Sequence, residues 1–150
     1  MKSDEDLDAL LDKIQDEAFD EARAALGEKG FERWRNPKFC GVMEDANCHA
    51  QLQGSCGDGM EIYLKVDNAR VVKASYVTDG CGSSSVAGSY AAELAMGKTF
   101  EEILAMTGAD ILAELGTFPR EDEHCTVLAV MTLQKAVKNY LDEWAANHPQ

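Results

Sequence analysis

Three short motifs, widely separated along the chain, place cysteine beside glycine, aspartate or histidine. They are Cys56-Gly57-Asp58, Gly80-Cys81-Gly82 and His124-Cys125. Thiolates are soft ligands that suit an iron-sulfur cluster or zinc, whereas magnesium and calcium prefer oxygen ligands. A fold that uses these cysteines as one metal site must therefore bring three distant segments of the chain together.

Length and composition limit the class of protein. The 150 residues fit a single domain, 1–150, which is large enough to bury a core without disulfide bonds. The N-terminus shows no signal-peptide pattern, and no segment approaches the roughly 20 apolar residues of a membrane span, so we expect a soluble, cytoplasmic protein with no membrane partner. In that reducing compartment the five cysteines are expected to be ligands or reactive thiols. The net charge of −13 argues against nucleic acid and for a basic protein partner.

The first part of the chain has the hydrophobic period of a helix. An amphipathic N-terminal helical segment, 1–33, is expected to precede a core that spans 34–146. Gly27 and Gly30 are expected to close the helix, and residues 31–46 are expected to form an irregular connection. The recurring apolar residues, which we expect to be buried in the core, are Leu7, Leu10, Leu11, Ile14, Ala18, Ala22 and Ala25.

The middle of the chain has the period of β-strands. Residues 60–67 alternate between apolar and polar, Asp67-Asn68 is typical of a hairpin turn, and residues 71–78 form the next strand. A further strand near 49–55 completes a three-stranded antiparallel sheet.

The last part of the chain is helical again. Ser83 to Ser85 are expected to cap a helix that ends at Gly97, and Thr99 with Glu102 predicts a capping box for a short helix reaching about residue 106. Another short helix follows at 110–115, and the last helix begins near 119–122. Its expected buried side consists of Val127, Val130, Met131, Val137, Leu141 and Trp144. Strands segregated from helices predict an α+β fold with the helices packed on one face of the sheet.

The predicted elements place every motif at the end of an element. Cys56 and Asp58 fall in the turn between the first two strands, Cys81 at a helix start, and Cys125 in the first turn of the last helix. Because the N-terminal end of a helix carries partial positive charge, we expect thiolate to be favoured at Cys81 and Cys125. Asp58 offers a hard oxygen ligand, which should hold a cluster less permanently than a fourth cysteine would.

These motifs occur in an order and at spacings that carry a family resemblance. Between residues 34 and 144, the stretches NPKFCG, CGDGMEIYLKV, YVTDGCGSSSVAGSYAAELAMGKTFEEI and EHCTVLAVMTLQKAVKNYL resemble the IscU type of iron-sulfur cluster assembly scaffold, equivalent to the N-terminal domain of NifU. The resemblance implies that Cys56, Cys81 and Cys125 are cluster ligands, with Asp58 or His124 as the fourth. It also implies that Cys125 accepts persulfide sulfur from a cysteine desulfurase.

The function implied by the resemblance is that of a carrier and not an enzyme. Such a scaffold binds iron, builds a transient [2Fe-2S] cluster and transfers it to apo iron-sulfur proteins. A homodimer in which two chains share one cluster is compatible with this function. The chain departs from the family where Leu-Pro-Pro-Val-Lys is replaced by Phe118-Pro119-Arg120-Glu121-Asp122, so we do not expect a dedicated Hsp70-type chaperone.

Two alternatives use the same residues differently. The first is a zinc-bound persulfide acceptor of the SufU kind, with zinc on the same four ligands, although the chain lacks the long insertion of that branch. The second is a thiol enzyme with Cys125 as nucleophile and His124 as base; adjacent helical residues point about 100° apart, which places that pair poorly. Cys40 and Cys48 lie outside the three motifs and are expected to be small apolar core residues.

Overall fold

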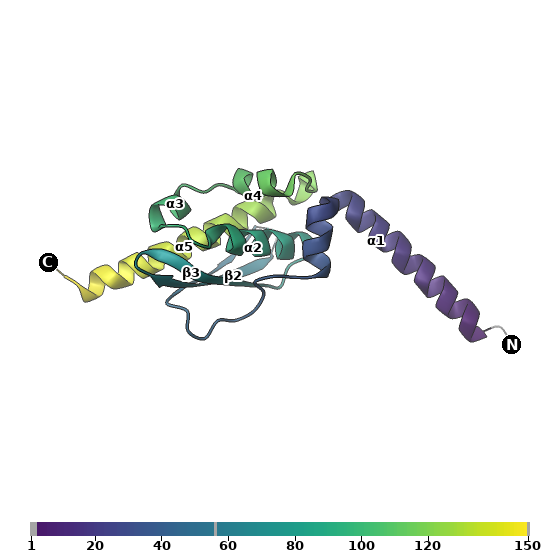
Figure 1. The fold of residues 1–150 in the computed structure, drawn as a ribbon, viewed down its shortest axis with the longest axis horizontal. Helices are drawn as coiled ribbons and strands as arrows, with labels where there is room; N and C mark the ends of the chain where they lie inside the picture. Colours follow the sequence, from purple (N-terminus) through teal and green to yellow (C-terminus); the bar gives the residue numbers. More distant parts are fainter. Residues whose placement is uncertain (1–2, 56, 150) are drawn as a thin grey trace.

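The computed structural model describes residues 3–55 and 57–149, which form one helix, a sheet and then a run of helices (Figure 1). The elements are α1 (Ser3–Arg35), β1 (Cys48–Gln53), β2 (Gly59–Asp67), β3 (Arg70–Thr78), α2 (Gly82–Ala95), α3 (Phe100–Leu104), α4 (Gly108–Leu115), the 3-10 turn η1 (Arg120–Asp122) and α5 (His124–Asn147). The strands are antiparallel in the order β1-β2-β3. Helices lie over one face of this sheet, which confirms the predicted α+β fold.

The sheet follows the predicted alternation closely. Met60, Ile62, Leu64 and Val66 of β2 are buried, and the residues between them are only partly covered. The hairpin turn lies one residue later than predicted, because Asn68 and Ala69 adopt positive φ values of 53° and 62° and form its two central positions. Two successive residues in this conformation match the right-handed twist of the flanking strands.

The helix α1 differs from the prediction at its end. It bends at Gly27, where φ is 76° and ψ is 173°, and then continues as a helix to Arg35. An alanine side chain at Gly27 would place its Cβ 2.8 Å from Cβ of Thr117, so the bend also needs the absence of a side chain. Residues 31–35, predicted to be irregular, are therefore helical.

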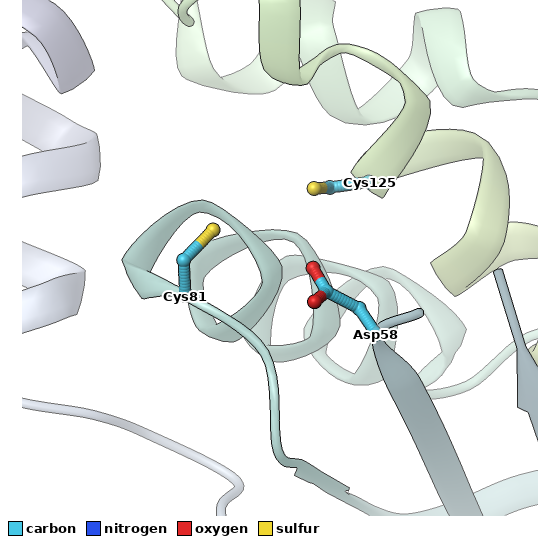
Figure 2. Close-up of side chains that lie close together, drawn as sticks. All are labelled: Asp58, Cys81 and Cys125. Carbon is cyan, nitrogen blue, oxygen red and sulfur yellow. The ribbon is translucent and has the colours of Figure 1, made fainter. Parts of the chain in front are cut away.

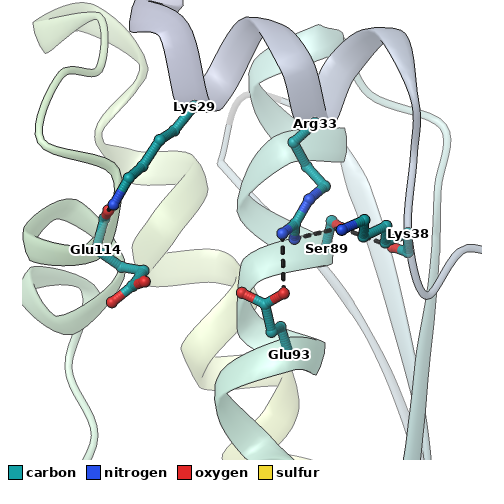
Figure 3. Close-up of polar contacts among 6 residues, drawn as sticks. All are labelled: Lys29, Arg33, Lys38, Ser89, Glu93 and Glu114. Atoms are coloured by element: carbon teal, nitrogen blue, oxygen red, sulfur yellow. Dashed lines mark hydrogen bonds and ion pairs between the residues drawn. The ribbon is translucent and has the colours of Figure 1, made fainter.

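The part of α1 after the bend is anchored to the body of the protein (Figure 3). The buried guanidinium of Arg33 donates to Ser89 Oγ at 3.0 Å and to Glu93 Oε1 at 2.9 Å, both on α2. Its Cζ also lies 4.0 Å from the ring centre of Tyr90. Lys29 Nζ donates to the carbonyl of Glu114 on α4 at 3.0 Å. These contacts explain why the chain stays helical beyond the bend.

The prediction that the stripe on the first part of α1 belongs to the core is wrong. Leu7, Leu10, Leu11 and Ile14 are 52 to 54% exposed. In Figure 1 this part of the helix projects away from the sheet and the other helices. Spacing correctly indicated an amphipathic helix, but nothing in the described chain covers its apolar side.

The helix α5 is buried on a different side from the one predicted. Val130 and Val137 are buried as expected, but Val127, Met131, Leu141 and Trp144 are 38 to 53% exposed. The side that packs against β1, β2 and α2 carries two leucines and four small residues: Leu128, Leu133, Cys125, Ala129, Thr132 and Ala136. Apolar residues occur on more than one side of α5, and the sheet selects the side with the closest fit.

Candidate metal site

The sequence motifs that lie within the described residues meet at one end of the sheet (Figure 2). Asp58 comes from the loop before β2, Cys81 immediately precedes α2, and Cys125 lies in the first turn of α5. One carboxylate oxygen and the two sulfur atoms lie within 4.8 Å of one another. These positions confirm the predicted placement of the three residues, and the distance allows one metal centre to contact all three.

The local backbone fixes Asp58 and Cys81 through the residues at the ends of β2 and β3. The Gly59 N–H donates to Asp79 Oδ1 at 2.7 Å, and Thr78 Oγ1 donates to the Gly59 carbonyl at 2.6 Å. The Gly80 N–H in turn donates to Thr78 Oγ1 at 3.1 Å. The loop that carries Asp58 is thereby tied to the segment that leads into Cys81.

Glycine at position 80 is required by the side chains around it. A Cβ atom on Gly80 would lie 2.6 Å from Ser84 Oγ and 2.8 Å from the carboxyl carbon of Asp58, well inside van der Waals contact. Gly80 therefore gives the Asp58 carboxylate room to approach the two sulfur atoms.

Ser84 is a site residue that the sequence reasoning did not identify. It is fully buried in the first turn of α2, and its hydroxyl donates to Asp58 Oδ2 at 2.9 Å and lies 3.4 Å from Cys125 Sγ. Ser83 to Ser85 were expected to cap α2, but Cys81 occupies the cap position and the serines lie within the helix. The sequence feature that could have identified Ser84 is the run of three serines, which are poor helix formers, directly after the Gly-Cys-Gly motif.

Burial, not the helix end, controls the protonation of Cys125. The thiol is 1% exposed, and this burial raises its pKa to about 11, even though the Ser84 hydroxyl acts to lower it. The expectation that the start of α5 favours a thiolate at Cys125 is therefore wrong for the metal-free protein. A metal ion that binds here must displace the proton from this sulfur.

His124 lies beside the group of three candidate ligands and does not belong to it. Its Nε2 lies 3.8 Å from Cys125 Sγ, a long contact, and the residue is exposed. Within the described residues the three-ligand group consists of Asp58, Cys81 and Cys125. Cys56, predicted to be a further ligand, lies outside the described residues. The raised pKa of Cys125 disfavours the thiol enzyme alternative, because a nucleophilic cysteine must ionise near neutral pH.

The two other cysteines occupy different environments. Cys48 on β1 is buried against the core, and burial raises its pKa to about 12, so it is the small apolar residue that was expected. Cys40 is exposed, beside β3 where its segment pairs with Tyr76, so the same expectation is wrong for Cys40.

The segment 118–122, which replaces Leu-Pro-Pro-Val-Lys, ends in the turn η1 next to the site. Asp122 at its end accepts a hydrogen bond of 2.8 Å from Ser83 Oγ on α2. The negative charge of Asp122 also acts to raise the pKa of Cys125, although less than burial does. The Asp122 carboxylate therefore places a negative charge at the edge of the site.

The α+β fold and the three converging side chains define a small protein with a candidate metal site at one end of its sheet. A NifU-like protein (N-terminal part) from Brucella abortus has a similar fold, with a TM-score of 0.64 over 81% of this chain and 98% of that one, at 16% identity. The model of the NifU-like N-terminal domain family matches residues 26–146, and the chain belongs to this family.

Two curated relatives agree with this assignment. The iron-sulfur cluster assembly scaffold protein IscU 1 of Archaeoglobus fulgidus is 36% identical over 114 residues, which is 75% of this chain and 74% of the relative. The iron-sulfur cluster assembly scaffold protein IscU of Aquifex aeolicus is 38% identical over 117 residues, 76% of this chain and 74% of the relative. Across the described residues, no helix has the length and apolar character needed to span a membrane.

Proposed function

We propose that this protein is a scaffold on which an iron-sulfur cluster is assembled and from which the cluster is transferred to apo-proteins. The observation that carries the proposal is the group of Asp58, Cys81 and Cys125, whose ligand atoms lie within 4.8 Å of one another. Two thiolates and a carboxylate suit iron or zinc better than magnesium or calcium. Its relatives from two organisms are named as iron-sulfur cluster assembly scaffold proteins, which supports the choice of iron and sulfide.

The proposed ligands suit a cluster that is bound for a time and then released. Cys81 is exposed, whereas Cys125 is buried, so incoming iron meets one open and one sheltered sulfur. Cys56 is proposed as a further ligand from the sequence motif alone, and His124, next to Cys125, as an alternative to Asp58 for the fourth position. We propose a [2Fe-2S] cluster, and an oxygen ligand beside thiolates should hold this cluster less permanently than a further cysteine would.

Sulfur is proposed to arrive as a persulfide from a cysteine desulfurase. Iron bound at the site displaces the proton of the buried Cys125 thiol to solvent. The resulting thiolate attacks the outer sulfur of the donor persulfide, whose S–S bond breaks; a new S–S bond to Cys125 forms, and the donor cysteine leaves as a thiolate. Each transferred sulfur atom then needs two electrons from a thiol or an electron-transfer protein to become sulfide. The protein carries the product and returns to its starting state when an apo-protein removes it, so it is a carrier and not a conventional enzyme.

The replacement of the Leu-Pro-Pro-Val-Lys segment supports release without a dedicated Hsp70-type chaperone. Residues 120–122 form a 3-10 turn, and Asp122 is engaged by Ser83. We therefore propose that cluster transfer depends on the recipient protein and on the lability that Asp58 confers.

The test is anaerobic reconstitution of the full chain with ferrous iron, cysteine and a cysteine desulfurase. Wild type, Cys81→Ser and Cys40→Ser are compared by visible absorption and by iron and sulfide analysis. Cys40→Ser is the matched control, because Cys40 is also exposed but lies outside the three-ligand group. A coloured species with equal iron and sulfide in wild type and in Cys40→Ser, but absent from Cys81→Ser, supports the scaffold.

The opposite results identify the alternatives. A colourless protein that retains one zinc ion would favour the zinc-bound persulfide acceptor. A cluster that forms equally well in Cys81→Ser would remove the three-ligand group from the proposal.

A further inference from the structure

The first part of α1 presents an apolar stripe with a strongly acidic surround. Leu7, Leu11 and Ile14 recur at helical spacing, and each is more than half exposed. Residues 3–21 contain a single lysine and nine acidic residues: Asp4, Glu5, Asp6, Asp8, Asp12, Asp16, Glu17, Asp20 and Glu21. This is most of the chain's net charge of −13. Two such helices repel each other, so their pairing with one another is disfavoured.

Aromatic contacts across the bend at Gly27 hold this helix away from its own domain. The ring centres of Phe19 and Phe31 are 5.9 Å apart, and those of Phe19 and Trp34 are 6.2 Å apart. The Arg35 guanidinium carbon lies 4.3 Å from the Phe19 ring centre. Folding the helix back onto its own chain would break these contacts, so the stripe is available to another molecule.

The same chain carries a surface that complements the stripe. A groove runs along the outer side of α5 beside the end of β1, with two adjoining hollows of about 360 and 290 Å³ that share Leu52 and Met131. We call this the α5 groove: Leu52, Val127, Leu128, Met131, Lys135 and Lys138. Val127 and Met131 are 49% and 53% exposed. Among the described residues that line the groove none is acidic, and two are lysines.

We propose that the first part of α1 from one copy of this protein docks into the α5 groove of a second copy. Leu7, Leu11 and Ile14 then cover Leu52, Val127 and Met131, while acidic residues of α1 face Lys135 and Lys138. An amphipathic helix in an apolar groove with oppositely charged flanks is a common mode of recognition. When each copy docks its own α1 into the α5 groove of the other, the result is a dimer with two equivalent contacts.

The docked helix would lie close to the metal site of the second copy. His124, adjacent to the ligand Cys125, lines the same hollow as Val127 and Met131. The family match begins at residue 26, so the docking helix precedes the part of the chain that defines the family. Association of two copies through this helix therefore does not follow from the proposed scaffold function, and either can hold without the other.

The test uses sedimentation of the full chain from low micromolar to several hundred micromolar concentration. The helix variant is Leu7→Gln/Leu11→Gln/Ile14→Gln, and the groove variant is Val127→Gln/Met131→Gln. All five residues are exposed, so both variants should keep the wild-type unfolding transition measured by circular dichroism. Ala9→Gln, on the opposite side of α1 from the stripe, is the matched control.

We expect a wild-type dimer that the control retains and that each variant weakens by roughly tenfold or more in dissociation constant. The separate variant Lys135→Glu/Lys138→Glu should also weaken the dimer, because it puts acidic residues opposite the acidic helix. High salt should weaken the wild-type dimer as well. An equimolar mixture of helix variant and groove variant should form a heterodimer, because one intact helix then meets one intact groove. A wild type that stays monomeric, variants that dimerise normally, or a mixture that does not associate would each overturn the proposal.

Discussion

Replacing Ser84 with alanine should weaken metal binding, although Ser84 is not itself expected to be a ligand. Its hydroxyl donates to Asp58 Oδ2 at 2.9 Å and lies 3.4 Å from Cys125 Sγ, in a fully buried position. The single hydroxyl proton serves one acceptor at a time, so donation to Asp58 leaves the oxygen free to accept from the Cys125 thiol. Ser84 therefore orients both ligands in the metal-free protein.

The expected magnitude follows from the hydrogen bond to a carboxylate. Such bonds contribute about 1.5–3 kcal/mol, and removal of a group that orients a ligand typically costs about 10–100-fold in metal affinity. These two ranges agree, because 1.4 kcal/mol corresponds to about tenfold. We expect Ser84→Ala to bind a single divalent ion about 10–100-fold more weakly than wild type.

Anaerobic titration with cobalt(II) against a competing chelator measures this affinity through the cobalt–thiolate absorption. Ser83→Ala is the control, because the neighbouring serine also donates to a carboxylate, that of Asp122, which lies outside the three-ligand group. Ser84→Ala should also cost less in an Asp58→Ala background, since part of its effect acts through Asp58. Equal affinities for Ser84→Ala, Ser83→Ala and wild type would refute the reasoning.

Three further predictions concern ligand exchange, protonation and packing. Asp58→Ala should lengthen the lifetime of a reconstituted cluster, followed by loss of visible absorption; equal or faster loss would contradict the role of the oxygen ligand. Because burial raises the pKa of Cys125 to about 11, its alkylation in the metal-free protein should be slow at neutral pH and accelerate as the pH rises toward 11, with exposed Cys81 modified first. Mass spectrometry measures the alkylation rate at each of the two cysteines. A Cys125 that reacts as fast as Cys81 at neutral pH would contradict the prediction. Gly88→Ala should lower the free energy of unfolding by about 1–3 kcal/mol in urea denaturation, because the new Cβ would lie 2.7 Å from Cδ2 of buried Tyr76. An unchanged unfolding midpoint would show that α2 can move away from the sheet at no cost.

Local patterns in the sequence were sufficient to predict the sheet and the short helices. The alternation from Met60 to Val66 predicted the buried face of β2, and the Thr99 and Glu102 capping box is present at the start of α3. For these elements the signal lies in neighbouring residues. The convergence of Asp58, Cys81 and Cys125 was expected for a different reason, namely the metal-ligand chemistry of the three motifs and the family resemblance that they carry.

The incorrect predictions concern properties that depend on distant parts of the chain. Spacing identified α1 as amphipathic but could not show that its domain leaves Leu7 and Ile14 uncovered. The pKa of Cys125 depends on burial by the whole fold, which the helix-end argument at one residue ignores. Ser84 acts through Asp58, 26 residues earlier in the chain, so its role needs the tertiary structure.

The wide separation of the ligands along the chain has a thermodynamic consequence. Asp58, Cys81 and Cys125 are 23 and 44 residues apart, and closing two flexible loops of these lengths would cost about 3 kcal/mol each from chain entropy alone. Folding of the apolar core meets this cost before any metal arrives, because Met60, Ile62 and Leu133 are fully buried without help from the ligands. Binding and release of a metal at these residues should therefore not require the loops to be closed again. A small metal-folded domain behaves differently, because it unfolds when its ion is removed.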